Sequence, residues 1–562
     1  MFAGVIFFLA LIVRGYRIAV IQPHHDEAPV FGYTRGEALV WEGSAEKFLS
    51  TLFRNAVFIS EGDTPPLPCV LAELFRYFFG ENLAAARWFH ALLDSLAIAL
   101  TAWLARRIFS PPQPAAAAVA AAASFSLVSI VFGQFGEMYA IYLLVSVIQY
   151  GAYWMLVRNG FGWKGYLQFA LVAFACTLFE YLQILVTAGI LLASILERAR
   201  VPRSKRLLRA AGSLGVYLMV NVIPFVFLYA GAGYGLKMGH RLYLGNNYPS
   251  KWLIETGGCP LLNYLWYLLS RTYDLFSYHL AAVFNPRWYR PLGWNWFFLP
   301  FMLLAAGGLF LRLRSRVDFK RPGSGVWVAL GSVLISYAIG NALFLVPYGG
   351  VRNSLFIAPL VWLAYGDLAR VYLLGLKNRR LRFLLAGAVT ILPVLPWLCS
   401  LPGFYRDRVS RFDGRELMAA VRKYKPDTLI MPQASYHPYL MLLQEREGLA
   451  EFLRDQTGLT VTSFFELEDE RWGNYPIPVG GDKVLALDVY QSWNGGREGR
   501  GITKDHPSLE LLFGPGWIVH PLTERPGSHV LIEEHQSLYY PPNSFYLYLL
   551  ERKGGKPGEG GG

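Results

Sequence analysis

Residues 1–27 read MFAGVIFFLALIVRGYRIAVIQPHHDE, an apolar run that ends in four polar residues. The run from 3 to 22 has about the 20 residues that a helix needs to cross the hydrocarbon core of a bilayer. His24, His25, Asp26 and Glu27 would then lie at the membrane–water boundary, where a lipid presents its head group. A solvated loop beyond a helix end would have the same pattern, and these residues alone do not separate the two interpretations.

The composition of the chain is typical of a polytopic membrane protein. Of its 562 residues, 54% are hydrophobic and 16% are charged, which is too apolar for a soluble enzyme of this length. The net charge of +13 does not indicate a nucleic-acid partner, because the basic residues cluster in short segments between apolar spans. The first span has no basic region before it and no cleavage site after it, so we predict a retained helix.

The four cysteines lie far apart, without the CxxC spacing of zinc or iron–sulfur sites. They are Cys69, Cys176, Cys259 and Cys399. A disulfide between Cys69 and Cys259, across two outer loops, is one interpretation.

Apolar spans recur along the first 400 residues and predict about eleven transmembrane helices. The fifth and sixth are short and are joined by a tight turn at Glu180. The predicted spans are 3–22, 84–105, 114–133, 140–157, 165–179, 181–196, 210–230, 292–311, 324–346, 353–374 and 383–401.

Lysine and arginine cluster in every second connection between these spans, which marks that side as cytoplasmic. The amino terminus is therefore predicted to be cytoplasmic, in a multi-pass protein of the cell (inner) membrane. The long outer loops contain two segments with amphipathic patterns, 45–58 and 261–284, that would lie along the interface. The basic clusters begin at Arg106, Arg158, Arg198, Arg312 and Arg370.

After residue 401 the pattern is that of a soluble α/β domain outside the cytoplasm. Helices are predicted at 413–424 and 436–446, and strands at 427–431, 483–489, 517–520, 529–533 and 545–551. The predicted domains are therefore a transmembrane domain at 1–402, the α/β domain at 403–553 and a disordered Gly-rich tail at 554–562.

Several ionisable residues fall inside predicted spans, where they are costly unless they pair or line a cavity. Arg87, His90 and Asp94 lie at i, i+3 and i+7, on one helical face. Arg14 and Arg17 lie in the outer half of the first span. A structural ion-pair network explains these residues as well as a functional site does, and for Arg17 snorkelling to the head groups is the simpler explanation.

Three further polar segments lie at the predicted outer side. Asp63 lies in a rigid turn before the second span, Glu137 and Tyr139 lie in the turn after the third, and Arg352 follows two glycines at the start of the tenth. Backbone N–H groups, a helix dipole and a guanidinium at such a helix start can bind a phosphate. Arg352 could equally face water.

Together these segments resemble the dolichyl-phosphate-mannose protein mannosyltransferase family and the bacterial aminoarabinose transferases, which share the C-type glycosyltransferase fold. The matching features are Arg14 followed by Asp26-Glu27, the Pro65-Pro66-Leu67 turn, residues 86–93 (ARWFHALL), the 137–139 turn and residues 352–359 (RNSLFIAP). Each motif is loose, and their order and topological placement carry the resemblance.

The resemblance implies that an acidic residue of the first outer loop, here Asp26, is the catalytic base. Relatives often carry Lys or His before the Pro-Pro pair, where this chain has Asp63-Thr64, and many carry Arg where Glu137 stands. Both departures leave the donor-phosphate contacts, and therefore the sugar, open.

The predicted function is inverting sugar transfer from a polyprenyl-phosphate donor to a hydroxyl of a glycan, lipid or protein acceptor. Asp26 is the predicted base with Glu27 supporting it, and Arg352 is the first candidate for the phosphate. Competing cations on the outer half are Arg87, Lys237, Arg241 and Arg271. Glu137 would position the acceptor or hold a divalent metal ion together with Asp26, although we expect a reaction that is independent of metal.

Two other classes of protein fit the same composition. A transporter or flippase of lipid-linked sugars would show inverted repeats and broken helices near the membrane midplane, and the sequence shows no internal repeat. A non-catalytic envelope assembly protein would use the carboxyl-terminal domain as a binding module.

Overall fold

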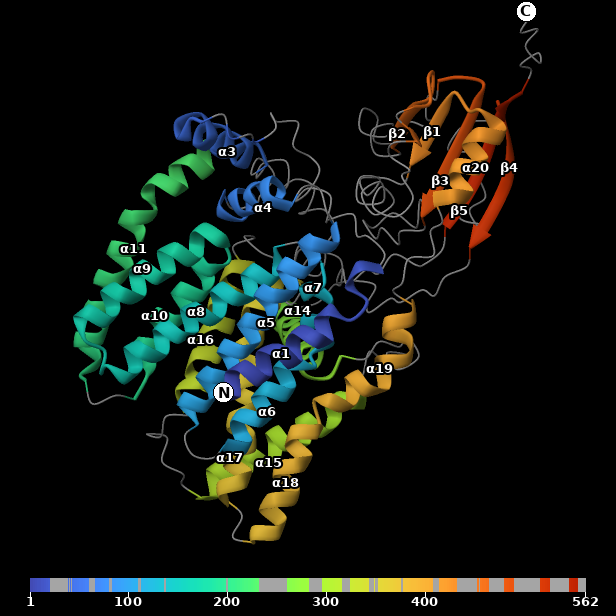
Figure 1. Cartoon of the computed structure of the whole chain (residues 1–562). Helices are drawn as coiled ribbons and strands as arrows, with labels where there is room; N and C mark the ends of the chain where they lie inside the picture. Colours follow the sequence, from blue (N-terminus) through green and yellow to red (C-terminus); the bar gives the residue numbers. More distant parts are fainter. Residues whose placement is uncertain are drawn as a thin grey trace, which may run out of the picture. The chain divides into compact units, whose positions relative to one another are not determined.

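The structure of the protein is a computed structural model, shown in Figure 1. It describes residues 1–20, 39, 41, 43–59, 66–79, 83–109, 113–135, 138–198, 201–231, 260–282, 296–315, 324–342, 348, 352–375, 378–407, 414–431, 452–453, 455–463, 480–489, 516–525 and 545–553.

The chain divides into two compact units. The first comprises Met1–Tyr16, Gly36–Leu74 and Arg87–Leu401, and the second comprises Arg17–Arg35, Phe75–Ala86 and Pro402–Gly562. The domain boundaries predicted from the sequence, at 402, 403 and 553, stay predictions, and the predicted disordered tail at 554–562 lies outside the described residues.

Helices make up the first unit, labelled in Figure 1. The helices are α1 (Phe2–Gly15), α3 (Ala45–Ile59), α4 (Pro66–Phe79), α5 (Leu83–Ile108), α6 (Gln113–Ser124), α7 (Leu127–Gly133), α8 (Tyr139–Arg158), α9 (Trp163–Phe179), α10 (Gln183–Leu196), α11 (Arg203–Gly231), α14 (Pro260–Ala281), α15 (Leu299–Ser315), α16 (Ser324–Ala342), α17 (Ala358–Gly375), α18 (Arg379–Ile391) and α19 (Val394–Asp407), of which α4, α5 and α19 reach into the second unit. Short 3-10 segments are η1 (Ile18–Val20), η5 (Trp296–Phe298) and η6 (Arg352–Ile357).

Among the described residues, four helices are long and apolar enough to cross a membrane, and the number rises to six if each of two bent pairs is one span. The chain is thus a mostly helical membrane protein with four to six such spans in its described part. The four are Ala84–Ile108, Tyr139–Arg158, Gly325–Ala342 and Ser354–Leu374. The predicted number of eleven crossings stays a prediction.

Small residues let the apolar helices pack closely, as is common between helices in membranes. A Cβ atom on Gly189 of α10 would lie 2.6 Å from the Val333 Cα atom of α16. A Cβ atom on Gly366 of α17 would lie 2.3 Å from the Val119 side chain of the alanine-rich helix α6. Larger residues at either glycine would push the paired helices apart.

The first predicted span is shorter than expected. The sequence predicts a helix over 3–22, whereas α1 ends at Gly15 and the short segment η1 follows. Arg17 adopts φ 58, a left-handed conformation that ends a right-handed helix. The apolar composition of residues 18–22 therefore extends beyond the helix itself.

The predicted span 114–133 is also wrong as a single helix. It consists of α6 and α7, which are bent by 53° at a short break. Ser126 begins the second helix, because its side chain accepts a hydrogen bond from the Ser129 N–H, as an N-cap does. Similarly, the predicted span 383–401 consists of α18 and α19, bent by 48°, and Pro393 lies in that break.

The carboxyl-terminal part of the second unit contains a five-stranded sheet. Its strands, in the order β2-β1-β3-β5-β4, are β1 (Thr428–Met431), β2 (Thr460–Ser463), β3 (Lys483–Val489), β4 (Trp517–Arg525) and β5 (Phe545–Arg552). The strands β2, β1 and β3 are parallel, and β5 is antiparallel to both β3 and β4. Helix α20 (Gly414–Tyr424) packs Leu417 and Val421 into the same buried cluster as Leu429 and Leu485.

Four of the predicted strands and one predicted helix of this region are confirmed, at α20, β1, β3, β4 and β5. The predicted helix 436–446 and the predicted strand 529–533 lie outside the described residues. The strand β2 was not predicted, because its four residues Thr-Val-Thr-Ser are too few and too polar to stand out as a strand.

Candidate functional site

A buried ion pair joins two helices of the first unit. The guanidinium of Arg14, near the end of α1, donates to the carboxylate of Asp94 on α5. The two side chains are 0% and 2% exposed, and Asp94 lies within the apolar span Ala84–Ile108. A buried charge in such a segment requires a partner, and here each charge neutralises the other.

A serine of a third helix forms hydrogen bonds with both members of this pair. The Ser129 hydroxyl of α7 accepts from Nη2 of Arg14 at 2.9 Å and lies 3.1 Å from Oδ2 of Asp94, to which it donates. Gly133, on the same helix, leaves room for the carboxylate, because a Cβ atom there would lie 2.8 Å from Asp94 Cγ. Helix α7 therefore contributes a polar partner for the ion pair, Ser129, and also the space that the Asp94 carboxylate occupies.

The remaining Arg14 donors bind main-chain carbonyls at the break between α6 and α7. Nη1 donates to the Ser124 oxygen at 3.0 Å, and Nη2 lies 3.5 Å from the Ala123 oxygen. These carbonyls lie in the last turn of α6, where the helix supplies no partner. In a membrane such groups must be satisfied by protein, so Arg14 stabilises the bend.

Gln134 fixes the C-terminal end of α1. Its Nε2 donates to the Arg14 carbonyl oxygen at 2.6 Å and approaches that of Tyr16 at 3.4 Å. The ring of Trp88, on α5, packs where Gly15 has no side chain. We call Arg14, Asp94, Ser129 and Gln134 the polar node; it holds together the C-terminal ends of α1 and α7 and the N-terminal half of α5.

Most of the residues predicted to form the site lie outside the described part of the chain. These are Asp26, Glu27, Asp63, Glu137, Lys237 and Arg241. For Arg352 the structure describes the main chain, in the 3-10 segment η6, but not the side chain. The predicted Cys69–Cys259 disulfide likewise lies outside the described side chains.

Three predicted residues can be placed. Arg271 lies on α14, where its guanidinium pairs with the Asp274 carboxylate at 3.2 Å. Arg87 lies on α5 and is fully buried. Tyr139 begins α8. The centroid of its ring lies 4.6 Å from the ring centroid of Phe132 and 5.8 Å from that of Tyr142. The structure also shows His90 and Asp94 buried along α5 with Arg87, so the helical face that carries these three residues is covered by protein.

The polar node shows how two of the ionisable residues in the predicted spans are paired. The structural ion-pair interpretation holds for Arg14 and Asp94, although the partner of Asp94 lies on another helix and not on its own. Sequence reasoning missed Ser129 and Gln134. A signal was present, because an arginine and an aspartate in two different apolar spans suggest that the spans are neighbours.

The segment η6, which begins with Arg352, is held on two sides. The Ser354 hydroxyl lies 3.1 Å from Nε2 of His279 on α14, and the Tyr150 hydroxyl of α8 donates to the Phe356 oxygen at 2.6 Å. Burial lowers the pKa of His279 from 6.5 to about 4, so this imidazole is neutral at pH 7. The segment η6, which includes Arg352, is therefore held in place by hydrogen bonds with α8 and α14.

Glu180 lies in the turn between α9 and α10, as the sequence predicts. Its carboxylate accepts from the Leu182 N–H at 2.9 Å. Burial raises the pKa of Glu180 from 4.5 to about 7, although hydrogen bonds from Leu182 and Tyr142 oppose this. The carboxyl group is therefore partly protonated near neutral pH.

In the described part of the chain, no three His, Cys, Asp or Glu side chains form a group able to hold a metal ion. The predicted alternative, a metal ion held by Asp26 and Glu137, involves residues outside that part.

No family model and no curated protein matches the chain. Among solved structures, it is similar to ArnT from Cupriavidus metallidurans, which was crystallised with undecaprenyl phosphate bound. The match covers 97% of this chain and 96% of that one, with 13% identity and a TM-score of 0.48.

Proposed function

We propose that the protein is an integral membrane glycosyltransferase that moves a sugar from a polyprenyl-phosphate donor to an acceptor hydroxyl. The observation that carries the proposal is the polar node. It fixes the C-terminal end of α1 against α5 and α7, and the chain that leads on from α1 contains Asp26 and Glu27. A costly buried ion pair of this kind is expected where the position of a helix end matters.

The proposed reaction uses one carboxylate and at least one cation. Asp26 accepts the proton of the acceptor hydroxyl as its oxygen attacks the anomeric carbon of the sugar. The bond between that carbon and the phosphate oxygen breaks as the new bond forms, so the configuration at the anomeric carbon is inverted. The lipid phosphate leaves with the electron pair of the broken bond. Arg352 and Arg87 stabilise the charge that grows on this phosphate.

The accompanying proposals concern the membrane and the partners. The active site faces outward, with the amino terminus cytoplasmic and the carboxyl-terminal α/β region external, because the basic clusters fall on alternate connections. The donor is a lipid-linked sugar, and the acceptor is a glycan, lipid or protein.

The proposed base is tested by Asp26→Asn in purified full-length protein, with a radiolabelled polyprenyl-phosphate sugar as donor. Asparagine keeps the side-chain volume but cannot take the proton, so turnover should fall by about 100-fold or more. Glu27→Gln is the matched control and should cost less. Near-normal turnover by Asp26→Asn, at normal protein yield, would remove Asp26 from the mechanism.

A flippase of lipid-linked sugars is the second candidate, and one observation favours it. The bent pairs α6–α7 and α18–α19 are broken helices, which this class often uses near its binding site. In proteoliposomes a flippase would move the intact labelled donor across the bilayer, whereas the transferase would cleave the sugar from it. Translocation without cleavage would overturn the transferase proposal.

A further inference from the structure

A row of polar side chains runs along the contact between α8 and α10, two helices labelled in Figure 1. On α8 these residues recur at intervals of four, three and four positions, so they share one face of the helix. Helix α8 is one of the four apolar spans, where polar groups are costly unless protein or water satisfies them. We call the row the polar seam; it consists of Tyr142, Ser146, Gln149 and Tyr153 of α8 and of Glu180, Gln183, Thr187, Ser194 and Glu197 on or beside α10.

Hydrogen bonds between the two sides of the seam form three layers near the turn that precedes α10. Each layer pairs one residue of α8 with one residue of the turn or of α10, and successive layers are about one helical turn, roughly 5.4 Å, apart. Apart from Tyr142, every residue in these layers is buried. The pairs are Tyr142 with Glu180, Gln183 Nε2 with Ser146 Oγ at 2.7 Å, and Gln149 Nε2 with Thr187 Oγ1 at 2.6 Å.

The other end of the seam reaches Glu197, directly after α10. The buried Tyr153 hydroxyl is close enough to Glu197 and Tyr166 for electrostatic interaction, and Tyr166 of α9 donates to Ser194 at 3.0 Å. Burial raises the pKa of Glu197 above its ordinary value of 4.5, and the positive charge of Arg206 opposes this. With Glu180 before α10 and Glu197 after it, a carboxyl group that can bind and release a proton lies at each end of the seam.

Four buried polar atoms of the seam make no hydrogen bond within the described part of the chain. They are Oε1 of Gln183, Oε1 of Gln149, the Tyr153 hydroxyl and Oε2 of Glu197. All four can accept a hydrogen bond, and a buried acceptor without a partner is destabilising. Water satisfies such atoms in protein interiors, where one molecule typically makes about three hydrogen bonds. The chemistry of the seam therefore favours water along its length.

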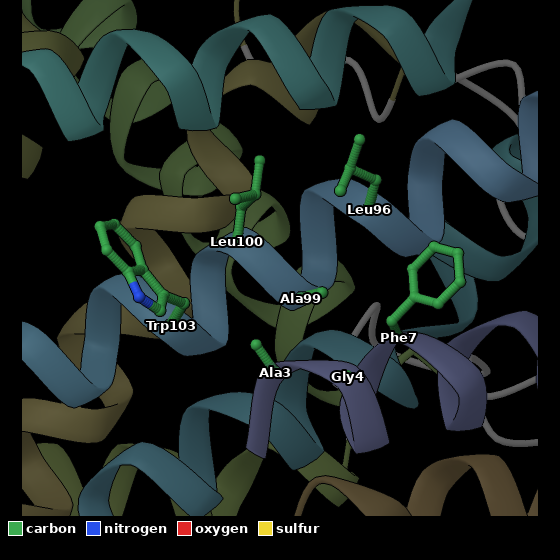
Figure 2. Close-up of a pocket in the computed structure, with 7 residues that line it drawn as sticks. All are labelled: Ala3, Gly4, Phe7, Leu96, Ala99, Leu100 and Trp103. Carbon is green, nitrogen blue, oxygen red and sulfur yellow. The ribbon is translucent and has the colours of Figure 1, made fainter. Parts of the chain in front are cut away.

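The space between α1 and α5, shown in Figure 2, has the opposite chemistry. This crevice has a volume of about 330 Å³, and its lining side chains carry no charge. Phe7, Leu96 and Leu100 offer water no partner, and the Trp103 indole is the only hydrogen-bond donor among the lining side chains. Unsatisfied acceptors beside hydroxyl and amide groups thus distinguish the polar seam from this apolar space.

We propose that the polar seam is a hydrated path that carries protons across the membrane, with Glu180 and Glu197 as the proton-binding groups at its ends. From Gln183 to Glu197 the helix rises by roughly 21 Å, which is most of the hydrocarbon core of about 30 Å. Rows of polar and ionisable residues inside membrane proteins often serve as proton relays. This activity is separate from the sugar transfer proposed above.

The transfer needs no reactant other than the proton and water. A proton from one aqueous phase binds the Glu180 carboxylate, which passes it to the first water of the path. Each water forms one O–H bond with the incoming proton and breaks another to release a proton to the next group. Glu197 gives up a proton at the far end, so one positive charge has crossed and every group is restored. The electrochemical gradient of protons sets the direction.

The test uses the full-length protein in liposomes that enclose a pH-sensitive dye and potassium chloride. Valinomycin lets potassium ions leave, and the resulting potential draws protons inward. We expect the lumen to acidify at least about tenfold faster than in protein-free liposomes. Equal rates in the two would overturn the proposal. No sugar donor is present, so the result is independent of the proposed transferase function.

Thr187→Val removes a hydroxyl from the middle of the seam and nearly keeps the side-chain volume. Thr101→Val is the matched control on α5, because both threonines are buried and both hydroxyls donate at 2.8 Å to the carbonyl four residues earlier. Thr187→Val should lower the proton flux on the order of tenfold, whereas Thr101→Val should conduct as the wild type does. Glu180→Gln keeps the side-chain size but cannot ionise, so it should lower the flux similarly even if Thr187→Val does not fold. Wild-type flux in the folded seam variants would show that protons cross elsewhere and would overturn the proposal.

Discussion

Removing the negative charge of the polar node should destabilise the protein strongly. In Asp94→Asn the fully buried guanidinium of Arg14 keeps only neutral partners, namely Ser129 and the carbonyls of Ala10, Ala123 and Ser124. Breaking a buried ion pair from one side typically costs about 3–5 kcal/mol. The amide oxygen of asparagine can still accept one hydrogen bond, so we expect a loss near the lower end, about 3 kcal/mol.

The assay is the free energy of unfolding in mixed micelles, measured by titration with sodium dodecyl sulfate and followed by circular dichroism. The matched control is Asp274→Asn, because Asp274 pairs with Arg271 at 3.2 Å but the two side chains are 17% and 14% exposed. Partly solvated pairs contribute about 1 kcal/mol or less. A loss for Asp94→Asn no larger than that of the control would refute the reasoning.

A double variant separates the ion pair from general packing. Arg14→Gln combined with Asp94→Asn leaves no uncompensated charge, so its loss should be at least about 1 kcal/mol smaller than the sum of the two single losses. Strict additivity would mean that the two side chains do not interact in the membrane.

Three further predictions address pH, the phosphate and the topology. Because burial raises the pKa of Glu180 to about 7, the wild type should lose stability as the pH rises from about 4.5 to 7, by up to about 3 kcal/mol. Glu180→Gln should lose this pH dependence of stability, whereas the control Glu46→Gln, at an exposed position, should keep it. Parallel stability–pH curves for the wild type and Glu180→Gln would contradict the prediction. Arg352→Ala should lose about 2–4 kcal/mol of transition-state stabilisation in kcat/KM and Arg352→Lys less, whereas wild-type turnover by Arg352→Ala would make this residue an interfacial anchor. A single cysteine at Ser435 in a cysteine-free chain should react with an impermeant maleimide in intact cells, and labelling only after lysis would reverse the predicted topology.

Helices and strands whose pattern is set by neighbouring residues could be predicted from the sequence. The apolar run of α8 and the strand Lys483–Val489 of β3 were found because periodicity and apolar length are local properties. Breaks within apolar runs were not found at Gly15 or at Ser126. Arg14 and Arg17 flank the first break and Ser124 and Ser126 flank the second, but apolar residues continue on both sides of each break. Further polar groups that stabilise the breaks come from a different helix.

The candidate site could be predicted only in part, for the same reason. The sequence singled out Arg14, Arg87 and Asp94, because charges inside apolar spans are rare and costly. It did not pair Arg14 with Asp94, which are 80 residues apart, and it gave no hint of His279 beside Ser354. Such contacts depend on which helices become neighbours.

The sequence by itself determined that this protein is helical and apolar in its first 400 residues and that a region of mixed helices and strands follows. Composition and periodicity are local properties of the chain, so they can be read without the structure. Only the tertiary structure decided where α1 ends, which partner neutralises Asp94 and where a crevice opens between α1 and α5. The physical reason is that a buried charge or an unsatisfied carbonyl is stabilised by whichever group the packing brings to it, and packing joins residues far apart in the sequence.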